Sequence, residues 1–172
     1  MTLTFVRDPE LTPALEEEIV QLWTAATNGG GAVGLVPPVA AEDVRPLADG
    51  QAAAVRSGAQ RLLAAYEDGA LAGIAYLKRN PDPLTAHWAW VVCVMVRPAL
   101  QGGGRGARLV RETVQMGRDL GFRALRLTAR GGHGLEHFYA RAGFEEIGRM
   151  PESINVGSGD RRDEIMMWLP LN

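Results

Sequence analysis

A run of glycines stands between the most strand-like segment of this chain and its most regular helical pattern. The segment Gln101–Gly106 has the sequence QGGGRG, and the apolar stretch Ala86–Val96 precedes it. After the glycines, one stripe of a helix is marked by Leu109, Val110, Thr113, Val114, Met116 and Leu120. A buried strand that turns through glycine into an amphipathic helix predicts a fold that mixes strands and helices.

The remaining segments extend this alternation. Strand patterns occur at residues 3–6, 61–66, 71–77, 124–128, 144–148 and 163–169, and helical patterns occupy the region from 15 to 28 and residues 40–58 and 135–142. The resulting order, β-α-α-β-β-β-α-β-α-β-β, predicts an α/β fold with a central sheet and helices on both of its faces. No repeat or linker interrupts the chain, so we expect residues 1–172 to form a single domain.

Composition narrows the cellular setting. The net charge is −2 over 172 residues, which predicts no binding to nucleic acid or to an anionic membrane surface. The sole cysteine, Cys93, lies in an apolar run, where we expect a core filler in a reducing compartment. The first ten residues, MTLTFVRDPE, lack the pattern of a secretory signal, and the apolar run 89–96 is too short to cross a bilayer. We therefore expect a cytoplasmic protein.

The glycine run suits phosphate binding. A helix N-terminus has unpaired N–H groups and partial positive charge, and glycine lets the backbone approach phosphate oxygens closely. The dinucleotide-binding fingerprint does not fit Gln101–Gly106, and no Gly-Lys-Ser/Thr sequence of a nucleotide P-loop occurs. Phosphate binding by backbone amides therefore stays open, beside the alternative of a merely flexible connection.

Two motifs together resemble the GCN5-related N-acetyltransferases, the GNAT family. Residues 94–106 (VMVRPALQGGGRG) are similar to that family's strand and its Gln/Arg-x-x-Gly-x-Gly/Ala pyrophosphate loop. Residues 137–144 (HFYARAGF) are similar to the family's Tyr-x-x-x-Gly-Phe helix ending. One helix and one strand separate the motifs, as in the family. The resemblance implies an acetyl-CoA-dependent N-acetyltransferase with a mostly antiparallel sheet whose strands splay after Val92.

The resemblance also implies the residues that hold acetyl-CoA. Backbone groups of Val94, Met95 and Val96 would bind the pantetheine arm. The pyrophosphate would be wrapped by Gln101, Gly102, Gly103, Gly104, Arg105, Gly106 and Ala107, with Arg105 adding positive charge. Tyr139 would protonate the departing thiolate during direct transfer in a ternary complex. The alternative for Tyr139 is a packed aromatic residue.

One position departs from the family pattern. Seven residues before its tyrosine the family often carries an asparagine that contacts the cofactor, and here that position is Gly132. Arg130 and His133, on either side of it, are the expected replacements as cofactor-binding residues.

An amine acceptor must also lose a proton. His87, at the head of the strand 86–96, is the candidate base, because imidazole titrates near neutral pH. Glu136, His137, His133, the pair Glu67 and Asp68, and a water relay are the alternatives. The three histidines are too scattered to predict a metal site.

The acceptor is predicted to be a primary amine of a small molecule. The loop 28–38 and the tail 151–162 look similar to those of small-molecule acetyltransferases of the antibiotic-resistance type, including tabtoxin-resistance-like enzymes. Trp23, Trp88, Trp90 and Trp168 are candidates for lining its pocket or for the core. A protein or peptide N-acetyltransferase and a non-catalytic CoA sensor are the alternative functions. A homodimer, through an edge strand near the C-terminus, is left open.

Overall fold

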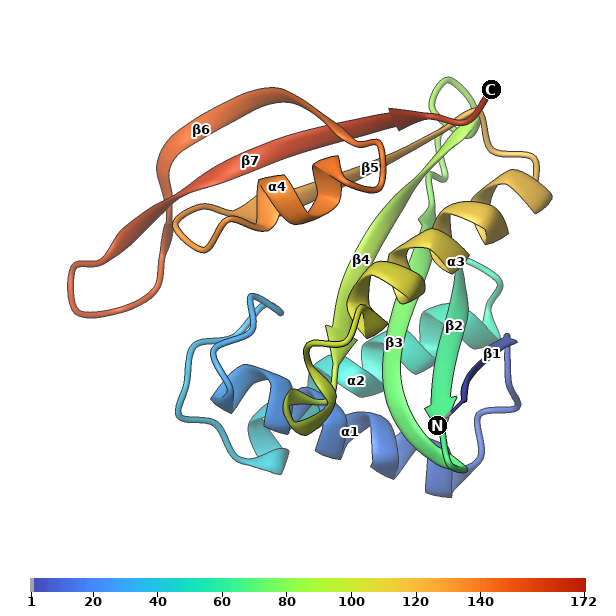
Figure 1. Cartoon of the computed structure of the whole chain (residues 1–172). Coiled ribbons are helices and arrows are strands. Elements are labelled where there is room, and N and C mark those ends of the chain that lie inside the picture. Colours follow the sequence, from blue (N-terminus) through green and yellow to red (C-terminus); the bar gives the residue numbers. More distant parts are fainter. Residues whose placement is uncertain (1) are drawn as a thin grey trace.

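The computed structural model describes residues 2–172 and contains four α-helices and seven strands (Figure 1). The helices are α1 (Pro13–Asn28), α2 (Ala41–Arg56), α3 (Arg105–Asp119) and α4 (Leu135–Ala140), with the short 3-10 helix η1 at Pro98–Leu100. The strands are β1 (Leu3–Arg7), β2 (Gln60–Glu67), β3 (Ala70–Arg79), β4 (Trp88–Val96), β5 (Ala124–Arg130), β6 (Glu145–Asn155) and β7 (Arg161–Pro170). This order confirms the predicted one. Within residues 2–172, no helix is long and apolar enough to span a membrane.

The strands form one sheet in the order β1-β2-β3-β4-β5-β7-β6. Neighbouring strands are antiparallel except β4 and β5, which run parallel, so the predicted mostly antiparallel sheet is confirmed. The hairpin of β6 and β7 is longer than its sequence pattern indicates. Residues 149–155 of β6 are mostly exposed and include Pro151, which an edge strand tolerates because its outer N–H groups need no partner.

Helices cover the sheet on both faces, as expected. On one face of β2, β3 and β4, helices α1 and α2 bury a cluster that includes Leu22, Trp23, Leu62, Ile74 and Tyr76. On the other face, α3 and α4 pack over a cluster that includes Leu77, Leu109, Leu125, Phe144 and Ile165. Figure 1 shows α3 in front of β2–β4 and α4 in front of β5 and β7. The two helices therefore flank the line where β4 and β5 meet.

Candidate active site

The sheet opens between its two parallel strands. Trp88, Ala89 and Trp90 of β4 pair with residues 124–126 of β5, and the paired register ends there. Beyond Trp90 the edge of β4 that faces β5 is free, which confirms the predicted splay and starts it two residues earlier than Val92. Free backbone N–H and C=O groups at a strand edge bind an extended chain as a further strand.

A β-bulge shapes this free edge. Two residues of β4, Cys93 and Val94, stand where β3 supplies only Ala75, and Cys93 has a φ of 53°. The bulge turns Met95 into the cluster under α1 and α2, whereas Val94 and Val96 pack on the α3 side. Burial raises the pKa of the Cys93 thiol to about 11, which agrees with a packed rather than a nucleophilic cysteine.

The glycine loop that follows adopts a conformation that favours glycine. Gly102, Gly103 and Gly104 have φ values of 87°, 57° and 77°, three left-handed residues in succession. Gly104 is the N-cap of α3 and has no side chain to cap the helix, so N–H groups of the first turn are left without intrahelical partners. Such a turn at a helix N-terminus is an anion-binding arrangement.

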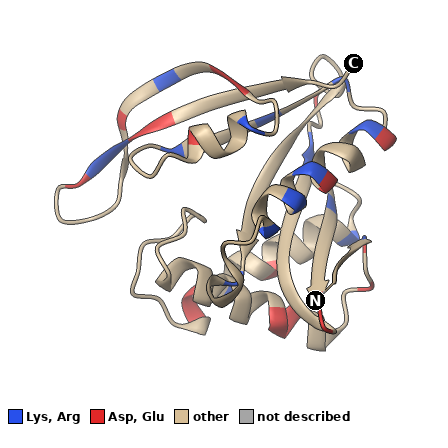
Figure 2. Ribbon diagram, viewed as in Figure 1, with Lys and Arg blue, Asp and Glu red and all other residues tan. Residues whose placement is uncertain are grey.

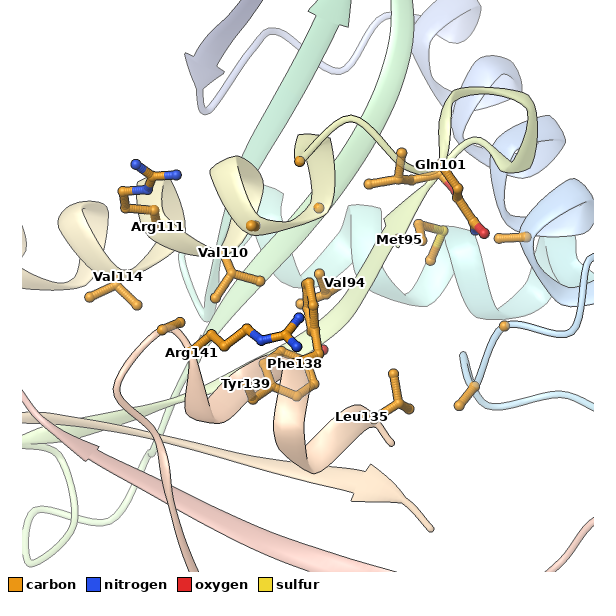
Figure 3. A pocket seen from close by; sticks show the side chains of 18 of the residues that line it. Val94, Met95, Gln101, Val110, Arg111, Val114, Leu135, Phe138, Tyr139 and Arg141 are labelled. Atoms are coloured by element: carbon orange, nitrogen blue, oxygen red, sulfur yellow. The ribbon is translucent and has the colours of Figure 1, made fainter. Parts of the chain in front are cut away.

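A cavity of about 790 Å³ connects the glycine loop with the free edge of β4 and with α4 (Figure 3). Its lining includes Val94, Met95, Val96, Gln101, Gly102, Gly104, Gly106 and Ala107 of the predicted cofactor residues, together with Tyr139. A Cβ on Gly106 would lie 3.3 Å from the Phe138 ring, so glycine there lets α4 approach α3 closely. The cavity has the size of a ligand pocket.

Tyr139 lines this cavity from α4. Phe138 and Tyr139 of α4, and Arg141 just after it, project toward Val94 and Val110 in Figure 3. The Tyr139 ring makes edge contacts with Phe138 and Phe144, with centroids 5.1 and 5.9 Å apart. Burial raises the pKa of Tyr139 to about 12, so its phenol stays protonated and can donate a proton through the neutral range.

Arg105 does not lie where the sequence predicts. Its Nε and Nη2 donate to the two carboxylate oxygens of Glu67 on β2, at 2.7 Å each, and Arg105 is absent from the cavity lining. Arg105 therefore anchors the start of α3 to the β2–β3 turn, and a contribution of its charge to phosphate binding stays a prediction. Gly103, beside it, also lies outside the lining.

His87 is likewise outside the cavity. It is exposed just before β4, where its carbonyl accepts a hydrogen bond from the Arg123 N–H at 2.7 Å. Seven residues of strand separate it from Val94, a distance of about 23 Å. His87 does not line the cavity, and its role as the base stays a prediction.

Arg130 and His133, the expected replacements for the asparagine, lie apart from the cavity lining. Neither lines the cavity, and His133 is exposed. A Cβ on Gly132 would lie 1.9 Å from Nη1 of Arg162, whose guanidinium is held by Asp160 at 2.7 and 2.8 Å. Gly132 has a φ of 97°, a left-handed conformation that favours glycine, and Arg162 of β7 lies over it; a role of Arg130 and His133 in cofactor binding stays a prediction.

Two further groups of residues line the cavity. One comes from the end of α1 and from the loop 28–38, which the sequence already associates with the acceptor: Ala26, Gly31, Ala32 and Val33. The other consists of Arg111 and Arg118 on α3 and Arg141 after α4. Figure 2 shows basic and acidic segments interspersed along α3. The helical pattern of α3 puts Arg111 and Arg118 outside its buried stripe, and only the approach of α4 to α3 identifies them as lining.

Comparison with known proteins decides the family. Residues 17–144 match the sequence model of the Acetyltransferase (GNAT) family. The chain belongs to the GNAT acetyltransferase family. The matched region holds the splayed strand, the glycine loop and Tyr139, so the predicted family and the predicted acetyltransferase activity are both confirmed.

Solved GNAT structures share the whole fold. An N-acetyltransferase from Staphylococcus aureus Mu50 matches with a TM-score of 0.81 and 14% identity over 100% of both chains. A ribosomal-protein-alanine N-acetyltransferase from Brucella melitensis matches with a TM-score of 0.77 and 20% identity, over 99% of this chain and 100% of that one. A proposed acetyltransferase from Salmonella typhimurium, solved with its cofactor acetyl-CoA, matches with a TM-score of 0.77 and 18% identity, over 100% of this chain and 95% of that one. These likenesses establish a common fold.

Proposed function

We propose that this GNAT protein binds acetyl-CoA in the cavity between α3 and α4 and transfers the acetyl group to a primary amine of a small molecule. One observation carries the proposal: the glycine loop, the free edge of β4 and the hydroxyl-bearing Tyr139 all border a single cavity of about 790 Å³. Phosphate-binding, chain-binding and proton-donating groups are therefore arranged around one space.

The residues present fit acetyl-CoA. N–H groups at Gly102–Ala107 suit the pyrophosphate, and the free edge at Val94–Val96 suits the amides of the pantetheine arm. Arg111, Arg118 and Arg141 give the lining a positive charge that matches a polyphosphate ligand. Acetyl-CoA supplies an activated acyl thioester for the reaction.

In this proposal Tyr139 is the general acid. Its raised pKa keeps the proton available at neutral pH, and the phenol protonates the thiolate that departs when the amine attacks. For the amine proton we propose a water relay, since His87 lies far from the cavity. The acceptor would enter beside Ala26 and Gly31–Val33, at the α1 side of the cavity.

A thiol-release assay tests the function. Purified protein is incubated with acetyl-CoA and a panel of small amines, amino acids and short peptides, and free CoA is measured. The proposal predicts turnover of small amines, and the Tyr139→Phe variant should lose about 10²–10⁴ in kcat while its Kd for acetyl-CoA stays unchanged. Preference for peptides would favour a peptide N-acetyltransferase, consistent with the Brucella melitensis structure. Binding without turnover of any amine would indicate a CoA sensor.

A further inference from the structure

One face of the sheet carries a row of aromatic and charged side chains outside the cavity. In the strand register Trp90 of β4 pairs with Arg126 of β5, Arg126 pairs with Trp168 of β7, and Trp168 pairs with Glu145 of β6. Residues paired across neighbouring strands project from the same face, so these four form a continuous row. We call Trp90, Arg126, Trp168 and Glu145 the cross-strand row.

The cross-strand row faces away from α3 and α4. Leu125 and Leu127, on either side of Arg126, are buried in the cluster under those helices, as are Met167 and Leu169 on either side of Trp168. Because side chains alternate along a strand, Arg126 and Trp168 point to the other face. Figure 1 shows α1 and α2 behind β2–β4, whereas α4 lies on the front of β5 and β7. Arg126 and Trp168 remain only half-buried.

Arg126 is held by aromatic rings. Its guanidinium carbon lies 4.5 Å from the centroid of Trp90 and 5.9 Å from that of Trp88. Its Nε is buried and has no hydrogen-bond partner among the described residues. Trp88 in turn makes an edge contact with Trp168, with centroids 5.6 Å apart. The cation is thus oriented by stacking on the tryptophan rings.

The register shows where a matching carboxylate could come from. Glu145 and Arg126 lie one strand to either side of Trp168, so two strand spacings, about 10 Å, separate their backbones within one chain. We propose that a second copy of this chain packs on this face about a two-fold axis at Trp168, so that Arg126 of each copy meets Glu145 of the other. A two-fold rotation at Trp168 places Arg126 of one copy opposite Glu145 of the other, and Glu145 of the first opposite Arg126 of the second. This is the self-complementarity that such an interface requires.

The surroundings of the cross-strand row suit a dimer interface. Met166, two residues before Trp168, covers Gly148, because a Cβ on that glycine would lie 2.9 Å from the methionine Cε. Met150, further along β6 on the same face, is 53% exposed. Tryptophan, methionine and arginine are enriched at the centres of protein interfaces, and charge pairs across them give specificity.

Sedimentation of single and combined charge reversals tests the proposal. The wild-type protein should sediment at twice the 18.5 kDa of one chain. Arg126→Glu and Glu145→Arg should each raise the dimer dissociation constant by about tenfold or more, because like charges then face each other. The combined variant should recover most of the wild-type affinity. Glu10→Arg, an exposed reversal on the loop before α1, should change nothing.

Three results would overturn the proposal: a wild-type monomer at every accessible concentration, single reversals that leave the dimer unchanged, or a combined variant no tighter than the single ones. Glu145 is exposed, so its reversal should keep the fold, which circular dichroism checks. If Arg126→Glu does not fold, Arg126→Met keeps the packing on Trp90, and Glu145→Arg should then no longer weaken dimerisation in that background.

Discussion

Arg105 at the start of α3 and Glu67 at the end of β2 form a doubly hydrogen-bonded ion pair, with both N···O distances at 2.7 Å. Only 5% of the Glu67 side chain is exposed, and Arg105 holds the pKa of that carboxyl below its ordinary value. The pair fixes the first turn of α3 to the sheet, so the glycine loop that precedes this turn is positioned by a contact 38 residues away in sequence.

The ion pair predicts a stability difference that depends on pH. Because the pKa of Glu67 is lowered in the folded state, the stabilisation is complete above the ordinary pKa of about 4.5 and is lost as pH falls through the folded value. Glu67→Gln should therefore melt below the wild type at pH 7, and the two melting temperatures should converge as pH falls below about 4.5. Thermal denaturation between pH 7 and pH 3 measures this.

The exposed neighbour Asp68 offers a control for that series. Asp68→Asn keeps the left-handed backbone that this turn position needs, with a φ of 52°, and should melt near the wild type at every pH. A Glu67→Gln deficit of the same size at pH 7 and pH 3 would contradict the assigned ion pair.

Tyr139 predicts the shape of the alkaline pH profile. Its pKa is raised to about 12, so the phenol stays protonated well above neutral pH. With a saturating amine, kcat should show no decline caused by Tyr139 ionisation between pH 7 and pH 10. A falling limb near pH 9 that disappears in Tyr139→Phe would show that the phenol ionises more easily than its burial implies.

Substitution of Trp23 should weaken binding of the acceptor without weakening binding of acetyl-CoA. Its buried Nε1 donates to the carbonyl of Val33 at 2.9 Å, and Val33 lines the cavity. Trp23→Phe keeps an aromatic ring and leaves that carbonyl unpaired, at a cost of about 1–3 kcal/mol. The expected result is a higher KM for the amine with an unchanged Kd for acetyl-CoA, measured by initial rates and calorimetry. Equal losses of affinity for the amine and for acetyl-CoA would mean that Trp23 supports the whole fold rather than the loop.

Local motifs account for what the sequence predicted well. The glycine loop and the Tyr139 helix ending are contiguous patterns, so their conformations follow from residues a few positions apart. The element order follows from periodicity in the same way. The splay between β4 and β5 was expected from the family resemblance. The register shows it, because only three positions of these two strands are paired.

Side-chain direction accounts for what the sequence predicted poorly. Arg105 points away from the cavity because it pairs with Glu67, and Arg162 of another strand lies over Gly132. His87 lies outside the cavity lining because it precedes β4, at the end of the strand opposite to Val94. Arg126 drew no attention because its stacking on Trp90 depends on the parallel pairing of β4 with β5. Each of these outcomes depends on tertiary contacts between distant residues.

The central claim is that the glycine loop binds the phosphates of acetyl-CoA, and calorimetric titration of two variants at Gly104 tests it most directly. Asparagine and aspartate both tolerate the left-handed backbone at this position, so Gly104→Asn and Gly104→Asp differ mainly in one negative charge. Gly58→Asp, at a turn with a similar φ of 80° and open space, controls for charge placed elsewhere. We expect micromolar binding by the wild type and by Gly58→Asp, a modest loss in Gly104→Asn, and at least a tenfold further loss in Gly104→Asp. Equal affinities of the two Gly104 variants, or no binding by the wild type, would contradict the account.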